Sequence, residues 1–514
     1  MNENIGKRSP GSAINTWYFP GVILFLAAVL IGMLTYQDYG IAWDEPEQRD
    51  LGVMSYDYVT KGDTAINANI DKRLGTGFEL PLVFVERSLH LSDMRDVYLS
   101  RHFATHLFFL IAAFCMYVLA YRMFGSKQLA SLAFIMLAFH PRLYAHSFFN
   151  SKDIPFLSAF LIALLFCQVA FQKNKLLWYV LAGFACAYAT SIRSMGILLV
   201  PSAGMFFLFD LITIKEKKGT VVVNFFSFTA SFCVMLYICW PYLWISPFHN
   251  FADAFASLAG IFWPGKVLFQ GAFYSGDKLP ASYMPVWFGI TVPEIWLAAG
   301  LAGIVWVLAD FAKHPARYLR NTSDRNFGLY IACFSLPVIA MIALHGVNID
   351  DWRHLYFIYP PFVMLALFTI NKLAKGKLKW IIIPLCSLQV VLIGVFMVRD
   401  HPHQQVYFNN LVSHKPEFLR KNYDLEYWGC SYKQALEHLM QQYPGTISIA
   451  RDYVPLTNNI MMLQDRDRKR ITITDHGADF MLTDFRLHPE DYPYPQEYSI
   501  KVLNSTIMCV YKMK

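Results

Sequence analysis

Two adjacent carboxylates, Asp44 and Glu45, lie between Trp43 and Pro46, a few residues after the first long apolar run of the chain. Carboxylates this close repel each other, and partial loss of water at a membrane face favours a proton on one of them. Such a group beside a substrate hydroxyl can act as a general base. A structural interpretation stays open, because Asp before Pro is also typical of a helix N-terminus. The two interpretations are compatible.

A second acidic position, Asp153, follows Asn150 and comes two residues before Pro155, where another apolar run begins. Asp153 is therefore a candidate cap of that helix. However, Asp44 and Asp153 each lie near a proline at the end of an apolar run. If both ends reach the same membrane face, the two carboxylates form a pocket for a metal ion or a hydroxyl-bearing substrate.

Single arginines stand at three further ends of apolar runs: Arg101, Arg193 and Arg353, the last followed by His354. Arginine near a membrane surface can extend to lipid phosphates without any further role. It also suits phosphate recognition, because its planar guanidinium matches phosphate geometry. These residues are therefore candidates for binding the phosphate of a lipid-linked substrate.

The composition shows which elements must position these residues. The chain has 514 residues, of which 55% are hydrophobic and only 16% charged. Soluble domains are about 25% charged. The composition argues against a soluble enzyme, a disordered protein and a nucleic-acid binder. It predicts a polytopic α-helical membrane protein, since the apolar residues come in runs of about 20.

Eleven apolar segments are predicted to span the membrane. They are 17–36, 102–123, 129–144, 154–171, 176–191, 195–214, 221–245, 292–311, 327–344, 354–370 and 380–398. The breaks between them alternate in charge, and every second break carries lysines or arginines. The positive-inside rule then places the N-terminus in the cytoplasm. The other breaks form outer loops at 37–100, 145–153, 246–291 and 346–353, which hold Asp44, Glu45, Asp153 and Arg353, and a short outer turn at 192–194, which holds Arg193.

The sequence becomes polar after Val398, so we expect a membrane domain over 1–398 and a small extracytoplasmic α/β domain over 399–514. In the second domain, 431–443 is predicted to be a helix, and 446–450, 470–474 and 479–483 to be strands. Residues 498–503 and 507–512 are predicted to form a terminal hairpin. Cys430 and Cys509 lie in this part, where a disulfide is permitted, but their spacing does not show whether they pair.

Taken together, the motifs resemble the GT-C fold of membrane glycosyltransferases, in particular the protein O-mannosyltransferase and aminoarabinose transferase branch. The matching pieces are Asp44-Glu45, Arg101, 150–155, 279–287, 351–361 and 401–409, followed by 424–429 and 431–433. The resemblance covers most of the chain. It implies a GT-C-like membrane domain of about eleven helices that uses a polyprenyl-phosphate-linked sugar.

The resemblance also implies roles for individual residues. Asp44 is the expected catalytic base, Glu45 assists it, and Asp153 lines the site. Arg101 is expected to bind the donor phosphate, and Arg353 and His354 match a later motif of the same kind. The sequence identifies no cofactor with certainty, although a divalent metal ion held by Asp44 and Asp153 is compatible with the resemblance.

The expected function is sugar transfer from a polyprenyl-phosphate donor to a hydroxyl of an extracytoplasmic glycan, lipid or protein, with inversion at the sugar. The expected location is a bacterial inner membrane, with membrane lipids as neighbours and no nucleic-acid partner. A transporter or flippase of envelope glycolipids is the alternative. Most charges lie at the ends of the apolar segments, whereas transporters place ionisable groups near the bilayer midplane. A non-catalytic scaffold would not need the acidic outer loops.

Overall fold

The computed structural model describes residues 16–69, 71–213, 218–256, 263, 265–344, 346, 349–415, 417–451 and 454–514. Within these ranges, nine helical stretches are long and apolar enough to cross a membrane. They contain α1 (Phe19–Thr35), α4 (Met94–Phe124), α7 (Asp153–Lys173), α9 (Leu199–Thr213), α10 (Lys218–Cys239), α13 (Glu294–Lys313), α15 (Thr322–Ala343), α16 (Tyr359–Ala374) and α17 (Lys379–Arg399). The shorter apolar helices α5 (Lys127–Ala138) and α8 (Leu176–Ile192) complete the eleven predicted segments. The chain is a polytopic helical membrane protein.

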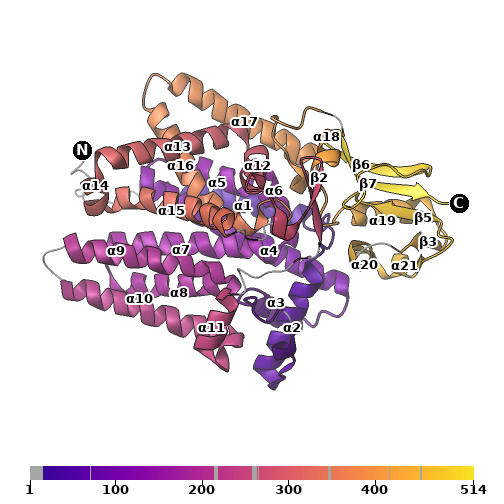
Figure 1. Ribbon diagram of the computed structural model, residues 1–514, viewed down its shortest axis with the longest axis horizontal. Helices are drawn as coiled ribbons and strands as arrows, with labels where there is room; N and C mark the ends of the chain where they lie inside the picture. The colour runs from indigo at the N-terminus through magenta and orange to yellow at the C-terminus, as the bar shows by residue number, and fades with distance from the viewer. Residues whose placement is uncertain are drawn as a thin grey trace.

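The membrane helices run side by side as a bundle, and the C-terminal region (residues 400–514) lies at one end of it (Figure 1). Contacts group the basic ends of the helices together. Lys127 donates a hydrogen bond to Thr16 over 3.2 Å, and Arg122 donates to Gln172. The short helix α14 (Pro315–Arg320) lies at the same end of the bundle, opposite the C-terminal region. The predicted alternation of charge therefore corresponds to a real separation in space.

The third predicted segment is shorter than expected. Helix α5 ends at Ala138, and a new helix, α6 (Pro141–Phe149), begins after His140. Proline cannot continue a helix but suits its first turn, so the break falls at Pro141. Every residue of α6 is buried. The expected outer loop 145–153 is therefore largely a helix packed inside the protein.

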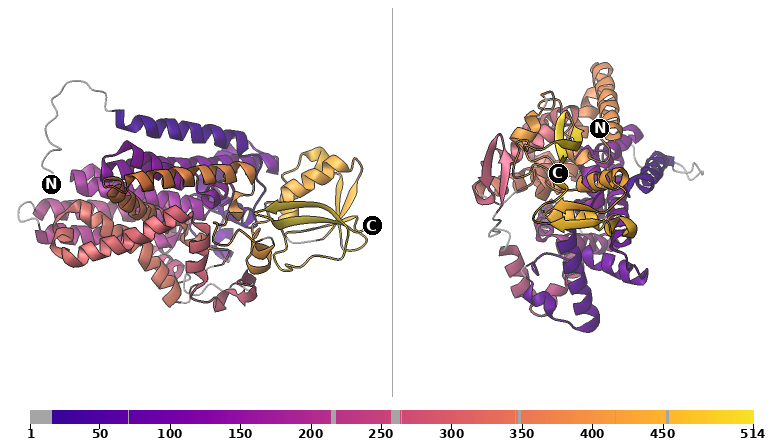
Figure 2. Two further views of the ribbon diagram at one scale, coloured as in Figure 1. Left: turned by 90° about the horizontal axis from the view of Figure 1, so that it is seen from above. Right: turned by 90° about the vertical axis from the view of Figure 1, so that its right-hand side faces the viewer.

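The first outer loop folds into α2 (Glu45–Lys61) and α3 (Glu79–Ser88). On α3 and just after it, Phe84, Val85 and Leu89 are exposed, as expected for a helix along the membrane surface. The long loop after α10 contains α11 (Pro247–Ala256), a hairpin of β1 (Lys266–Phe269) and β2 (Ala272–Ser275), and α12 (Tyr283–Thr291). Figure 2 shows α1 on the outside of the bundle, where much of its apolar surface is exposed.

The C-terminal region is an α/β unit, as predicted. Its helices are α18 (Phe418–Asn422), α19 (Tyr432–Gln442), α20 (Val454–Ile460) and α21 (Asp465–Arg468), and its strands are β3 (Ile447–Ala450), β4 (Ile471–Thr474), β5 (Phe480–Thr483), β6 (Gln496–Val502) and β7 (Ser505–Lys512). The sheet order is β4-β3-β5-β7-β6, with β3 parallel to β4 and β5. Leu503 and Asn504 both have positive φ in the terminal hairpin. Cys430 and Cys509 are buried free thiols.

Backbone contacts join the C-terminal region to the outer loops. Tyr423 forms an isolated antiparallel bridge with Phe269 of β1. Asn459 of α20 accepts a hydrogen bond from the amide of Ile41 over 3.0 Å. A Cβ on Gly40 would lie 2.2 Å from the Asn459 Oδ1 and 2.4 Å from the Cys430 carbonyl, so only glycine allows this close approach. The region is thus fixed beside the segment that carries Asp44.

Candidate active site

A cavity of about 260 Å³ lies where the outer loops meet the C-terminal region. Its lining residues come from four parts of the chain: Trp43 and Asp44; Trp263, Gly265 and Lys266; Ile349, Asp350 and Arg353; and Tyr427, Trp428, Arg486 and Leu487. Apolar and aromatic walls with a few polar groups are typical of small-molecule sites. We take this cavity as the candidate active site.

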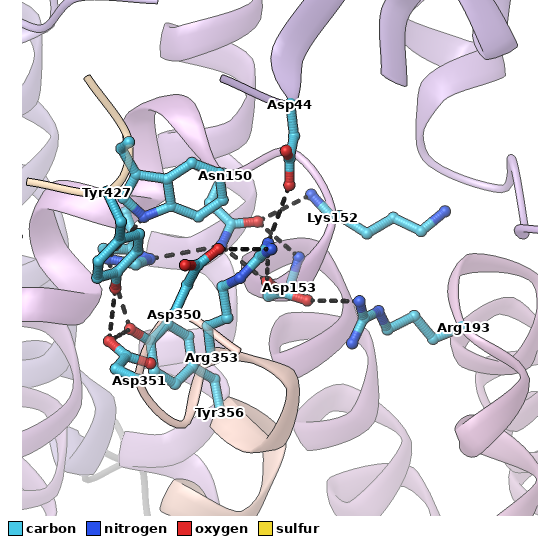
Figure 3. Close-up of polar contacts among 12 residues, drawn as sticks. Asp44, Asn150, Lys152, Asp153, Arg193, Asp350, Asp351, Arg353, Tyr356 and Tyr427 are labelled. Atoms are coloured by element: carbon cyan, nitrogen blue, oxygen red, sulfur yellow. Dashed lines mark hydrogen bonds and ion pairs between the residues drawn. The ribbon is translucent and has the colours of Figure 1, made fainter. Parts of the chain in front are cut away.

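Arg353 connects the acidic residues of the cavity. It is the first residue of the 3-10 helix Arg353–Ile358, which leads into α16. Its Nη1 lies 3.0 Å from Asp44 Oδ2 and 3.6 Å from Asp153 Oδ2, and its Nη2 lies 3.2 Å from Asp350 Oδ2. The guanidinium also lies 4.7 Å from the centre of the Trp428 ring. Figure 3 shows Arg353 between these carboxylates.

Asp44 is the most accessible of the three carboxylates. Its side chain is 35% exposed, compared with 1% for Asp153 and 7% for Asp350. It occupies the N-cap position of α2, yet it makes no capping hydrogen bond. The pairing with Arg353 places a positive charge beside this carboxylate. Asp44 is therefore placed to meet a substrate in the cavity.

Asp153 lies deeper and is held from both sides. Its Oδ1 pairs with Arg193 over 3.0 Å, and its Oδ2 accepts a hydrogen bond from the Asn150 amide over 3.0 Å. The side-chain Oδ1 of Asn150 in turn accepts a hydrogen bond from the Asp153 backbone N–H over 2.8 Å, so Asn150 fixes the position where α7 begins. The neighbouring Lys152 points away from Asp44 (Figure 3) and donates to the Gly75 carbonyl over 2.7 Å. Burial lowers the pKa of Lys152 to about 8, and Arg193 adds to this effect.

Asp351 supports the cavity from below but does not line it. Its Oδ2 accepts hydrogen bonds from Arg142, Tyr356 and Tyr427, at 2.9, 2.9 and 2.6 Å. Asp350 and Asp351 both have positive φ, at 58° and 64°. Such backbone is uncommon outside glycine and requires firm support from its surroundings. The three hydrogen bonds to Asp351 Oδ2 supply that support for the segment that carries Arg353.

Of the residues predicted for the site, only Asp44 and Arg353 line the cavity, whereas Asp153, Glu45, Arg101 and His354 do not. Glu45 is buried, accepts a hydrogen bond from the Ala42 amide over 2.8 Å and lies 3.1 Å from His102. Arg101 is not at the head of a helix, because α4 already begins at Met94. It forms a buried ion pair with Glu79. Glu45 thus ties the start of α2 to α4, and Arg101 ties α4 to α3.

His354 follows Arg353 and is partly exposed, but it does not line the cavity. A metal ion between Asp44 and Asp153 does not fit this arrangement, because the guanidinium of Arg353 already stands between their Oδ2 atoms. Nor do the described residues contain any group of three His, Cys, Asp or Glu side chains placed to hold a metal. We therefore derive no step through a metal.

Sequence reasoning missed several members of the site. Asp350, Lys266 and Arg486 line the cavity but received no role. Asp350 stands three residues before Arg353 and was the easiest to find. Arg486 follows Asp484 and Phe485 in the C-terminal region, and nothing in its local sequence connects it with a residue some 440 positions away.

Comparisons with protein families and with solved structures place the chain among known proteins. Residues 95–244 match the family of dolichyl-phosphate-mannose-protein mannosyltransferases. This stretch contains Arg101, Asp153 and Arg193. A search of curated protein sequences finds no match.

Among solved structures, the apo oligosaccharyltransferase of Archaeoglobus fulgidus is similar, with a TM-score of 0.51, 12% identity and coverage of 89% of this chain and 64% of that chain. The chain thus spans about 64% of the length of that enzyme. ArnT of Cupriavidus metallidurans bound to undecaprenyl phosphate matches over 95% of this chain and 97% of that chain, with a TM-score of 0.48 and 11% identity. The chain has the GT-C fold of membrane glycosyltransferases.

Proposed function

We propose that the protein is a membrane glycosyltransferase that moves a sugar from a polyprenyl-phosphate donor to a hydroxyl of an extracytoplasmic glycan, lipid or protein. The observation that carries the proposal is the accessible Asp44, paired with the buried Arg353 in an aromatic-walled cavity at one end of the membrane helices. The description of the matching family includes a dolichyl-phosphate sugar, which supports a lipid-phosphate donor.

In the proposed step, the carboxylate of Asp44 accepts the proton of the acceptor hydroxyl. The oxygen attacks the anomeric carbon as the bond from that carbon to the phosphate oxygen breaks, and polyprenyl phosphate leaves with one additional negative charge. A direct displacement of this kind inverts the sugar. Phosphate is a good leaving group, so fixed positive charge is needed more than a strong acid. Arg353 supplies that charge beside Asp44.

The other predicted residues enter the proposal with different roles. His354 follows Arg353 and is proposed to contact the donor phosphate, whereas the buried Asp153 orients Arg353 together with Arg193. Glu45 and Arg101 are proposed as positioning residues, because their buried contacts with His102 and Glu79 keep them from the cavity.

We further propose that the cavity faces the outside of a bacterial inner membrane and that the N-terminus is cytoplasmic. The lysine- and arginine-rich helix ends lie at the end of the bundle opposite the C-terminal region (Figure 1). Positive residues favour the cytoplasmic side.

Asp44→Asn tests the proposal, since asparagine keeps the shape but cannot take up the proton. General base catalysis contributes about 10²–10⁴-fold, so we expect the transfer rate to fall about 100-fold or more. The assay follows label from a panel of polyprenyl-phosphate sugars into an envelope extract, and the mass of the product identifies sugar and acceptor. Asp50→Asn is the matched control, because Asp50 is exposed on the same helix.

Near wild-type transfer by folded Asp44→Asn protein would rule out the base role. Movement of a labelled glycolipid across liposomes by the wild type, with no sugar transferred from any donor in the panel, would instead favour a flippase.

A further inference from the structure

Arg486 brings the C-terminal region into the candidate active site. It stands three residues after β5, and its side chain lines the cavity together with Asp44 and Arg353. The side chain is 11% exposed. Its charge is therefore largely removed from water and must be satisfied by its neighbours.

The guanidinium of Arg486 binds two groups that belong to the site. Its Nη2 donates to Asp350 Oδ1 over 2.7 Å, and its Nη1 donates to the Tyr427 carbonyl over 2.7 Å. Asp350 in turn contacts Arg353 through its other oxygen, Oδ2, at 3.2 Å. A chain of ion pairs thus runs from Arg486 through Asp350 and Arg353 to Asp44.

A second contact of Arg486 involves the residue before Asp44. The Arg486 guanidinium lies 5.4 Å from the centre of the Trp43 ring, in the range of cation–π attraction. Trp43 is the residue directly before Asp44. Arg486 therefore constrains both the backbone that carries Asp44 and the arginine that pairs with it.

We propose that Arg486 is a positioning residue for Asp44, so that the C-terminal region is a structural part of the catalytic centre. The mechanism is competition for Arg353. While Arg486 satisfies Asp350, Arg353 is free to pair with Asp44. Without Arg486, the carboxylate of Asp350 draws Arg353 towards itself and away from Asp44, which then takes up a proton more readily. The catalytic consequence rests on the proposed function, whereas the geometry does not.

The first experiment needs no substrate. Carbodiimide modifies protonated carboxyl groups, and mass spectrometry of the purified full-length protein reports modification of the exposed Asp44 as a function of pH. Other charged groups act on Arg486, namely Asp350, Asp424, Asp484 and Arg353, so the variants change Arg486 alone and together with Asp350. We expect Arg486→Gln to move the pH midpoint of Asp44 modification upward by about one unit, a tenfold change in protonation.

Matched variants separate positioning from general damage. Arg486→Lys keeps the charge beside Asp350 and should retain most of the wild-type profile. Arg486→Gln combined with Asp350→Asn should restore a midpoint near that of the wild type, because the competing carboxylate is gone. Arg451→Gln, an exposed arginine of the same region that pairs with Asp475, should have no effect.

The second experiment measures sugar transfer with the donor that is active in the wild type. Arg486→Gln should lower kcat about tenfold or more with little change in donor KM, since the base is misplaced while donor contacts remain. An unchanged Asp44 profile in folded Arg486→Gln protein, or a loss equally severe in folded Arg486→Lys, would overturn the proposal. If Asp44→Asn transfers normally while the Arg486 variants shift the Asp44 profile, the base role fails and the positioning of Asp44 stands.

Discussion

Arg353 contacts three carboxylates at once, and its side chain is only 9% exposed. A guanidinium suits this place, because its donors point in several fixed directions within one plane. Each buried acidic partner would be costly without it. The same cation therefore holds the three carboxylates together and lies beside the accessible Asp44.

Arg353→Lys tests whether the shape of the guanidinium matters as well as its charge. An ammonium group is compact and cannot span Asp44 and Asp350 together. Misplacement of a catalytic group by about 1 Å costs on the order of 100-fold, so we expect transfer to fall by about 10- to 100-fold. Steady-state transfer kinetics measure the loss, and Arg87→Lys, on the exposed face of α3, is the control. A wild-type rate in Arg353→Lys would show that charge alone suffices.

Asp44 and Glu45 show what the sequence could not decide at this scale. They are adjacent and chemically alike, yet Asp44 faces the cavity while Glu45 is buried against His102. The direction of each side chain depends on where α2 begins relative to α4, which is a tertiary contact. The acidic pair was therefore predictable as a candidate site, but which of its two side chains faces the cavity was not.

At the scale of elements, the β1–β2 hairpin is attached to the C-terminal region through Asp424. The Leu268 amide donates to Asp424 Oδ2 over 3.0 Å, and the Asp424 amide donates to the Leu268 carbonyl over 3.3 Å. Burial raises the pKa of Asp424 to about 8, and Asp350 adds to the effect against the opposing charge of Arg486. Burial likewise raises the pKa of Glu426 to about 7.

These carboxyls predict a pH-dependent stability. A carboxyl whose pKa is higher in the folded than in the unfolded protein contributes its full stabilisation of the folded state below its pKa in the unfolded protein, which is about 4. This contribution is lost as the pH rises towards its pKa in the folded protein, which is about 8 for Asp424. Each such group adds a slope of about 1.4 kcal/mol per pH unit in that window. Asparagine at position 424 can still accept the Leu268 hydrogen bond but does not ionise.

We therefore expect Asp424→Asn to lose less stability than the wild type between pH 5 and pH 8. Thermal unfolding in detergent across this range measures the difference, with the exposed Asp475→Asn as control. Equal slopes in the wild type and in Asp424→Asn would show that Asp424 is already ionised in the folded protein.

The elements differ in how well the sequence predicts them. Each of the eleven apolar segments corresponds to a helix, because a long apolar run has few alternatives in a membrane. The strands of the C-terminal region were also found, since β-branched residues between turn residues mark them. Helix α6 was missed as a separate element, because its first residues were assigned to the third apolar segment and the rest, with the buried His146, to an outer loop. Its polar residues are satisfied by partners distant in sequence, such as the Tyr407 carbonyl.

At the scale of the whole molecule, the cavity is a composite that no single segment contains. Asp44, Arg353 and Arg486 come from the first outer loop, the last outer loop and the C-terminal region. The membrane side predicted for each loop from its charge was enough to place Asp44 and Arg353 on the same face of the membrane. Nothing in the sequence reported that the C-terminal region folds back onto that face, because this depends on contacts such as that of Asn459 with Ile41.

The separation of charge across the molecule gives the last prediction. The lysines of the turn between α16 and α17, Lys372, Lys375, Lys377 and Lys379, lie at one end of the bundle, while α17 leads from there to the C-terminal region. Clustered lysines resist translocation, so this turn should stay in the cytoplasm and the C-terminus should reach the other side.

Alkaline phosphatase folds only where disulfides form. Alkaline phosphatase fused after Lys514 should be active, and alkaline phosphatase inserted after Gly376 should be inactive. A fluorescent protein that matures in the cytoplasm should give the reverse pattern at the same two positions. Active phosphatase at Gly376 would show that the orientation in the membrane is the reverse of the predicted one. The cavity would then lie on the cytoplasmic side, where the proposed extracytoplasmic acceptor could not reach Asp44.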